Sequence, residues 1–317
     1  MMHDMLLKNA VYDGIYGLSI ADAIGVPAEF RSRKELKANP ITDMVGYGTH
    51  YQKPGTWSDD TSLTLCLLDS LTNNIDYLNI MDKFRSWVEL GEYTPYGKVF
   101  DIGMATDQAI DQYIREVPVL QCGGTSEYNN GNGSLMRILP IAFYIKSKNI
   151  AYGQAMEITA DISSLTHAHI RSKMACCIYV TIALHLLDGE SLSGAIQKGL
   201  AQASELCKTK DPVEFRHFDR LMDPSFASLP EKAINSSGYV VDTLEAAIWC
   251  LLNTKNYHDC VLKAVNLGDD TDTTASVAGG LAGIVYTRDG IDKKWIEGLA
   301  RRDFIDKICD AFIAAHC

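Results

Sequence analysis

The sequence predicts an all-α protein, and three observations support this fold class. Apolar residues recur at spacings of three and four along most of the chain, as at Ile170, Met174 and Cys177. Proline and glycine separate these periodic segments, as Pro54 and Gly55 do. Pieces of β-rich composition, such as residues 117–120, are short and isolated. We therefore expect helices joined by turns, without a sheet.

Local residues explain where several of the predicted helices begin and end. The first ends at Gly25, because Pro27 cannot continue a helix. Ser and Asp residues at 58–60 precede the second, where they would cap the free N–H groups. The last carries many Ala and Gly residues between 275 and 283, so we expect it to pack closely and deep in the core. The expected helices span residues 12–24, 62–71, 80–90, 103–114, 135–145, 152–165, 167–187, 192–206, 241–252 and 273–285.

No repeat, linker or low-complexity tract divides the 317 residues. The polar, proline-bearing stretch 208–231 is typical of a long connection or insertion. We therefore expect a single domain over residues 1–317.

The charge of the chain limits its partners. There are 29 Lys and Arg against 40 Asp and Glu, which gives a net charge of −11. Such a balance argues against nucleic-acid binding by phosphate neutralisation and against docking on an anionic membrane. An anionic ligand would have to be bound by local structural features, such as a glycine loop, a helix N-terminus or a metal ion.

The nine cysteines include no C-x-x-C pair, and most lie in apolar runs. Reduced, buried thiols are expected, which favours a reducing compartment. The N-terminus lacks the apolar region of a signal peptide, and the apolar run 174–187 is too short to cross a bilayer. We therefore expect a cytoplasmic protein without a membrane partner.

Two acidic clusters precede predicted helices. Ser58, Asp59 and Asp60 form the first, and residues 269–273 form the second, with three Asp in four positions. Each could be a helix cap, but one capping residue suffices, and adjacent carboxylates repel one another unless a cation or a proton relieves them. Oxygen ligands of this kind favour Mg²⁺ or Mn²⁺ over Zn²⁺, and two clusters could supply a two-metal site.

Three further motifs have both a structural and a functional interpretation. The glycine turn at 131–133 could be a flexible loop or an anion cradle at a helix N-terminus. Glu29 follows a helix end and could be an ordinary exposed glutamate. His167 stands at the expected start of the longest helix, where a structural role is the usual one.

This ordered set of motifs resembles the ADP-ribosylglycohydrolase family, which includes the dinitrogenase-reductase-activating glycohydrolases. The matching segments are residues 17–29, 57–61, 131–137, 166–167, 238–244 and 268–273. The resemblance implies one compact domain of orthogonal helices with two ions, Mg²⁺ or Mn²⁺, in a cleft. It implies hydrolysis of the bond between the distal ribose of ADP-ribose and an acceptor, with release of ADP-ribose.

Matched positions assign roles to individual residues. The implied metal ligands are Ser58, Asp59, Asp60, Asp270, Asp272 and Thr273. The implied catalytic residues are Glu29, as general acid or base, with Asp59 and Asp60. The implied substrate-binding residues are Asn132, Gly133 and Ser134 along the diphosphate, Tyr239 as a stacking face for adenine, and His167.

Two residues depart from the family pattern. Ser58 stands where Thr is usual and keeps the hydroxyl, whereas Asp269 stands where Gly is usual and adds a charge. The acceptor stays open among arginine, serine, small guanidines, O-acetyl-ADP-ribose and modified nucleic acid, of which nucleic acid fits the charge least. Two other functions also stay open: a member that binds ADP-ribose without turnover, and a metal-dependent hydrolase of nucleotide diphosphates.

Overall fold

The computed structural model describes the backbone of residues 2–317 and the side chains from residue 6 onward. Helices make up the regular structure of this part of the chain, with only isolated bridges between Gly124 and His167 and between Gly131 and Tyr239. The all-α prediction is confirmed. The α-helices are α1 (Met2–Gly25), α2 (Arg33–Ala38), α3 (Asp59–Ser70), α4 (Tyr77–Leu90), α5 (Met104–Ile114), α6 (Leu139–Lys148), α7 (Tyr152–Ser164), α8 (Ile170–Leu187), α9 (Leu192–Lys210), α10 (Pro212–Phe215), α11 (Asp219–Met222), α12 (Val240–Leu252), α13 (Tyr257–Val265), α14 (Thr271–Tyr286), α15 (Lys293–Gly298) and α16 (Arg302–His316).

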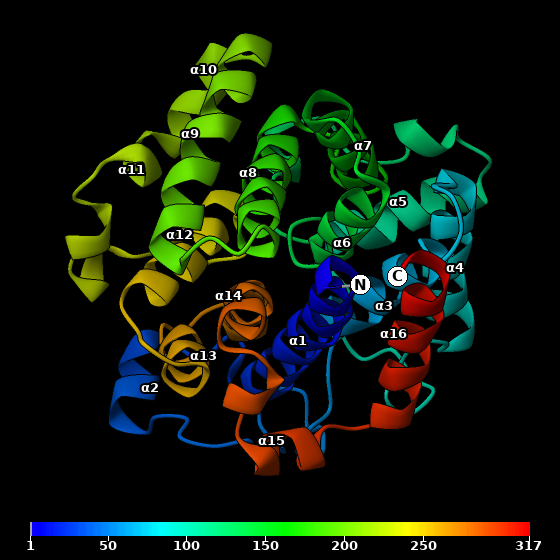
Figure 1. Ribbon diagram of the computed structural model, residues 1–317. Coiled ribbons are helices and arrows are strands. Elements are labelled where there is room, and N and C mark those ends of the chain that lie inside the picture. The colour runs from blue at the N-terminus through cyan, green and yellow to red at the C-terminus, as the bar shows by residue number, and fades with distance from the viewer. Residues whose placement is uncertain (1) are drawn as a thin grey trace.

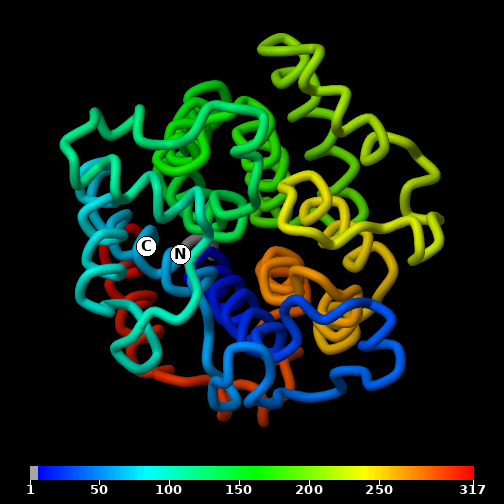
Figure 2. Tube along the Cα trace, turned by 180° about the vertical axis from the view of Figure 1, so that it is seen from behind, coloured from blue at the N-terminus to red at the C-terminus, as the bar shows by residue number. Residues whose placement is uncertain are grey.

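Helices α1 and α14, from opposite ends of the chain, lie side by side at the centre of the molecule (Figures 1 and 2). Glycines make this contact. A Cβ atom on Gly17 would lie 2.4 Å from the carbonyl oxygen of Gly279, and one on Gly283 would lie 2.1 Å from that of Asp13. Because no side chain fits between them, the two backbones touch. The close packing expected of the small residues in the last predicted helix is confirmed.

The other helices surround this pair. Buried apolar residues form one cluster that runs from Leu7 to Phe312. Helix α8 packs against α6, α7, α9, α12 and α14, while α16 packs against α1 and α3. With its full 18 residues α8 is long and apolar enough to cross a membrane, unlike the shorter run seen in the sequence. Its apolar window is 72% buried inside the protein, which is typical of a core helix.

Several predicted boundaries are wrong. Helix α1 begins at Met2 rather than residue 12, which makes it the longest helix at 24 residues. Helix α6 begins at Leu139 because Pro140 stands in its first turn, and α8 begins at Ile170 because the His169 side chain caps it. Helices α2, α13, α15 and α16 were not expected, and the stretch 208–231 contains α10 and α11.

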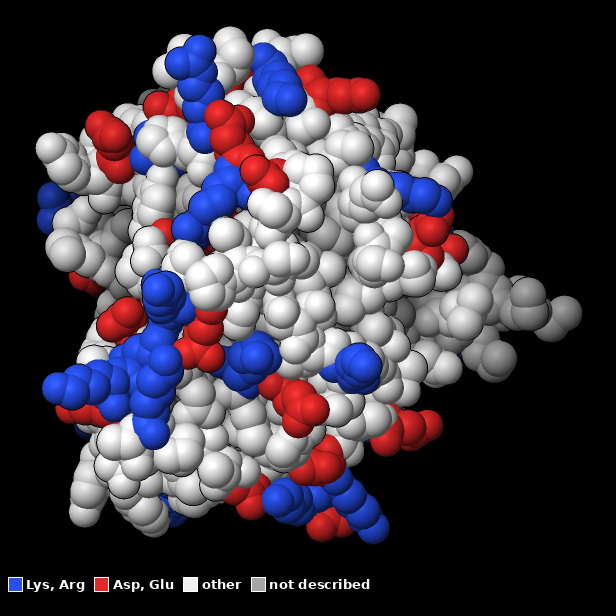
Figure 3. Space-filling view, turned by 90° about the vertical axis from the view of Figure 1, so that its left-hand side faces the viewer, with Lys and Arg blue, Asp and Glu red and all other residues white. Residues whose placement is uncertain are grey.

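One face of the surface carries charges of both signs. On the face shown in Figure 3, Lys and Arg side chains lie among Asp and Glu side chains, and no wide area carries one sign. Eight cysteines, from Cys66 to Cys309, are buried free thiols, as expected.

Candidate metal centre and substrate site

Asp22 of α1 holds the start of α3. Ser58 donates to Asp22 Oδ1 through its N–H at 3.0 Å and its Oγ at 2.9 Å. Thr61 donates to Asp22 Oδ2 through its N–H at 3.1 Å and its Oγ1 at 2.5 Å. Burial raises the pKa of Asp22 to about 6, against the effect of these hydrogen bonds. The first acidic cluster is thus fixed to the central helix.

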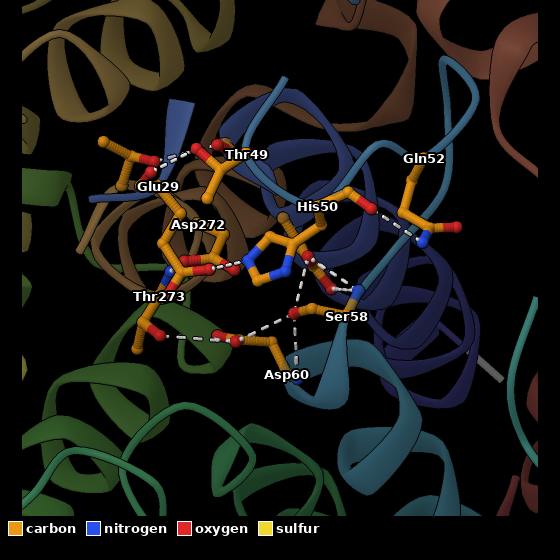
Figure 4. A network of polar contacts seen from close by, with 11 residues as sticks. Glu29, Thr49, His50, Gln52, Ser58, Asp60, Asp272 and Thr273 are labelled. Atoms are coloured by element: carbon orange, nitrogen blue, oxygen red, sulfur yellow. Dashed lines mark hydrogen bonds and ion pairs between the residues drawn. The ribbon is translucent and has the colours of Figure 1, made fainter. Parts of the chain in front are cut away.

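Asp60 connects this cluster with the start of α14. Its Oδ1 accepts a hydrogen bond from Ser276 Oγ at 2.6 Å, and its Oδ2 accepts one from Thr273 Oγ1 at 3.3 Å. Asp22, Asp60 and Asp272 each offer a carboxylate oxygen, and these atoms lie within 4.8 Å of one another. The two acidic segments, far apart in sequence, therefore meet at one place (Figure 4).

Glu29 lies in the same centre. It follows the 3-10 turn after α1 and is 6% exposed, so it is not an ordinary surface glutamate. Its Oε2 accepts a hydrogen bond from His50 Nε2, and its carbonyl oxygen accepts one from Thr49 Oγ1 at 2.5 Å (Figure 4). Glu29, Asp270 and Asp272 also offer oxygens within 4.8 Å of one another. Burial raises the pKa of Glu29 to about 7, although the His50 contact acts in the opposite direction.

The structure adds Asp22, His50 and Asp101 to the expected set. His50 and Asp101 form a further group with Glu29, with ligand atoms within 4.8 Å of one another, and Asp22 belongs to the group with Asp60 and Asp272. His50 and Asp101 come from irregular segments where single polar residues give no pattern. Asp22 did give a signal, because an acidic residue stands there inside an apolar helical segment.

The centre gathers seven carboxylates, and in the described part of the chain no ion pair brings a Lys or Arg to any of them. They are Asp22, Glu29, Asp59, Asp60, Asp101, Asp270 and Asp272. Burial and the neighbouring acids hold the pKa values of Asp59, Asp60 and Asp272 well above the usual range. Asp59 lies near enough to feel the charges of Asp101 and Glu29, but it joins none of the three tight groups.

These residues fit a divalent cation. Asp270 Oδ1 is buried without a hydrogen-bond partner, and crowded carboxylate and hydroxyl oxygens are the ligands that hard cations prefer. Of the residues predicted from sequence, Asp60, Asp270 and Asp272 belong to the tight carboxylate groups, and Asp22 lies in the same group as Asp60 and Asp272. The Asp269 side chain, by contrast, is exposed and belongs to none of the carboxylate groups among the described residues.

The glycine loop is fastened to the acidic centre. Asn132 Nδ2 donates to Asp270 Oδ2 at 2.8 Å and to Thr243 Oγ1 at 2.9 Å. Gly131 forms a bridge with Tyr239, which is half-buried at the start of α12. The Arg171 guanidinium lies over the Tyr239 ring at 5.8 Å. The expected diphosphate and adenine residues thus lie together next to the acidic centre.

The loop is not a helix N-terminus, contrary to the sequence prediction. Residues 133–137 form turns and α6 starts only at Leu139, so an anion would be bound by loop N–H groups. The Ser134 hydroxyl points into the core, where it accepts a hydrogen bond from Ser163 Oγ at 3.0 Å. Arg137 is fully buried, and it donates a hydrogen bond to the carbonyl oxygen of Gly133 that fixes the loop to the core.

His167 supports the same loop. A Cβ atom on Gly133 would lie 2.8 Å from His167 Cε1, so glycine is needed for this approach. His167 Nδ1 lies 2.8 Å from Thr166 Oγ1. Burial lowers the pKa of His167 to about 3, so the ring is neutral at physiological pH.

The fold is all-α, and its buried acidic centre, beside a glycine loop, offers the oxygen donors that a divalent cation prefers. Comparison with known proteins gives the family. The family model described as ADP-ribosylglycohydrolase matches residues 3–317, and the chain belongs to the ADP-ribosylglycohydrolase family. It is thus an enzyme of the kind that hydrolyses ADP-ribosyl–acceptor bonds.

Relatives span most of the chain. It is 33% identical over 299 residues to the ADP-ribosylarginine hydrolase Tri1 of Serratia proteamaculans, covering 93% of this chain and 76% of that protein. It is 28% identical over 290 residues to the ADP-ribosyl-[dinitrogen reductase] glycohydrolase of Rhodospirillum rubrum, covering 89% and 87%. A solved structure described as an ADP-ribosylglycohydrolase-related protein complex matches with a TM-score of 0.77 at 26% identity, covering 98% of this chain and 99% of that one.

Proposed function

We propose that the protein is a divalent-cation-dependent hydrolase that releases ADP-ribose from ADP-ribosylated arginine. The observation that carries this proposal is the set of seven carboxylates without a Lys or Arg partner in the described ion pairs. ADP-ribose adds two negative charges, so positive charge has to come from cations and from the acceptor. The guanidinium group of arginine stays charged when it is linked to ribose and meets this need. Two relatives at 33% and 35% identity are named ADP-ribosylarginine hydrolases.

The residues around Asp59 are of the types that recognise a guanidinium group. Asp59, Asp101, Trp57 and Phe100 line one small hollow beside the acidic centre. Carboxylates and aromatic rings are the two surfaces that recognise a planar cation.

The metal ligands would be the six predicted from sequence, holding Mg²⁺ or Mn²⁺, as two ions. When bound, these cations offset the carboxylates and polarise hydroxyl groups of the distal ribose. Mn²⁺ and Mg²⁺ suit the same oxygen donors, so the residues alone do not choose between them.

Glu29 is proposed to transfer the proton. In the hydrolysis, water adds to the anomeric carbon, the bond to the guanidine nitrogen breaks, and that nitrogen keeps the electron pair and takes up a proton. A carboxyl group with a pKa of about 7 can accept the proton of water and return it to the leaving group. His50 positions the Glu29 carboxyl through Oε2. Neighbouring carboxylates stabilise the positive charge that develops on the sugar.

A panel of substrates tests the proposal. The protein is incubated with ADP-ribosylated arginine, ADP-ribosylated serine, O-acetyl-ADP-ribose and ADP-ribosylated nucleic acid, with Mg²⁺, with Mn²⁺ and with EDTA, and products are separated by chromatography. ADP-ribose from the arginine substrate, lost with EDTA, supports it. AMP and ribose phosphate would indicate a nucleotide-diphosphate hydrolase, and binding without turnover a non-catalytic member.

A reducing, cytoplasmic location stays part of the proposal, supported by the buried thiols.

A further inference from the structure

Three aromatic residues near the site combine exposure with an unfavourable backbone. Phe30, Tyr47 and Tyr51 are 69%, 58% and 79% exposed, and we call them the aromatic rim. Their φ angles are 63°, 60° and 54°. Bulky L-residues rarely adopt this left-handed conformation, because the side chain meets the backbone. Neither burial nor backbone preference explains aromatic residues at these positions.

Tyr93 provides the contrast. It has a φ angle of 59° but is only 9% exposed. Its hydroxyl donates to Asp69 Oδ2 at 2.5 Å and accepts from Lys83 Nζ at 3.1 Å, and its ring packs against Phe304. Tyr93 therefore gains contacts that offset its strained backbone. The rings of Tyr47 and Tyr51 contact each other at 5.6 Å, and among the described residues no hydrogen bond engages either hydroxyl.

The aromatic rim adjoins the catalytic residues. Phe30 follows Glu29 directly, and its ring lies 6.0 Å from the ring of His50, which donates to Glu29. Tyr47 and Tyr51 flank His50 in one turn, closed by a hydrogen bond from the Tyr47 N–H to the carbonyl oxygen of Gln52 at 2.7 Å. The glycine loop contacts the acidic centre at Asp270, through Asn132. The aromatic rim borders the centre beside Glu29 and His50.

We propose that the aromatic rim is a docking surface for the polypeptide that carries the ADP-ribosylated arginine. The proposal rests on the proposed function and adds that the substrate is a protein. Tyr and Phe offer a large contact area at a small cost in side-chain entropy, and free tyrosine hydroxyls can donate to peptide carbonyls. A free ADP-ribosylated arginine ends at the scissile bond and offers little surface to three exposed rings. A polypeptide continues beyond that bond and can cover them.

The test compares two substrates in one variant. Asn adopts the left-handed conformation readily, so the double variant Tyr47→Asn/Tyr51→Asn removes both rings and keeps the turn. For a protein mono-ADP-ribosylated on arginine, we expect kcat/KM to fall about 10-fold through a higher KM, as for loss of an interface anchor. For free ADP-ribosylarginine, kcat/KM stays unchanged. Leu78→Asn, at an exposed apolar residue of α4, is the matched control and changes neither value.

Every other result of this comparison contradicts either the docking surface or the proposed function. Equal kcat/KM values of the wild type and the double variant on the protein substrate overturn the docking surface. Equal losses on both substrates also overturn it, because the rings would then serve the nucleotide or the catalytic centre. If the wild-type enzyme cleaves neither arginine substrate, the proposed function itself fails.

Discussion

The backbone N–H of Phe30 donates to the carbonyl oxygen of Asp269 over 2.7 Å, and both residues have left-handed φ angles, 63° and 61°. The N–H of Asp269 in turn donates to the carbonyl oxygen of Arg31 at 2.9 Å. These two bonds fasten the segment of Glu29 to the loop that carries Asp270. Asp tolerates the left-handed conformation better than most residues, which suits its place at 269.

Glu29→Gln tests proton transfer. The variant keeps the size and hydrogen bonding of the side chain but cannot exchange a proton at neutral pH. We expect kcat to fall by about 10²–10⁴-fold, the usual effect of losing a general acid or base. The binding of ADP-ribose, measured by calorimetry, should change far less. If the variant turned over at the wild-type rate, Glu29 would not be the general acid or base, and Asp59 and Asp60 would be the next candidates for that role.

Asp272→Asn tests the acidic centre as a metal site. In the wild type we expect Mg²⁺ or Mn²⁺ to raise Tm and EDTA to reverse the rise, because the cation binds only the folded protein. Removing one carboxylate should abolish turnover and this metal-dependent shift. Without metal the variant should be at least as stable as the wild type, since one of the mutually repelling acids is gone. Asp269→Asn, at an exposed side chain, is the control and should retain the metal response.

Tyr239→Ala tests the adenine position. If adenine stacks on the ring face not covered by Arg171, its removal should weaken ADP-ribose binding by about 0.5–1.5 kcal/mol. Tyr239→Phe keeps the stacking face and should bind ADP-ribose nearly as well as the wild type. Titration calorimetry at saturating Mg²⁺ measures both. Equal affinities of the Ala variant and the wild type would remove Tyr239 from the ligand site.

Gly279→Ala tests the contact between α1 and α14. The added Cβ would lie 2.4 Å from Ala21 Cβ and 2.5 Å from the carbonyl oxygen of Gly17, so the helices must move apart. We expect a loss of about 1–3 kcal/mol in the free energy of unfolding, measured with urea. Gly153→Ala on α7 has nothing within 4 Å and should be neutral or stabilising. Similar effects of the two changes would show that the helices do not touch through their backbones.

His167→Gln tests the neutral histidine. Because the folded-state pKa is about 3 and the ordinary value 6.5, only the unfolded chain gains a proton as the pH falls below 6.5. Wild-type stability is therefore lost between pH 6.5 and 3, by about 1.4 kcal/mol per pH unit from this residue. Urea unfolding at pH 7, 6 and 5 should show a shallower dependence in the variant. The carboxylates with raised pKa contribute equally to the pH dependence of both proteins. If the free energy of unfolding of the wild type and of the variant changed equally with pH, the buried neutral ring would be contradicted.

The sequence by itself determined the fold class, most helices and the acidic and glycine-rich segments, because these depend on neighbouring residues. Periodic apolar residues indicate helices, and repeated Asp beside Ser and Thr indicates oxygen ligands. Short helices such as α2 escaped this reasoning, because six residues show too little periodicity.

Only the tertiary structure decided which residues share the centre. Glycines bring α1 against α14, and this contact sets Asp22 beside Asp60 and Asp272. His50 and Asp101 join through irregular loops, whose paths depend on long-range backbone contacts that no local pattern records. The raised pKa of Glu29 likewise arises from burial and surrounding charge, which exist only once the chain has folded.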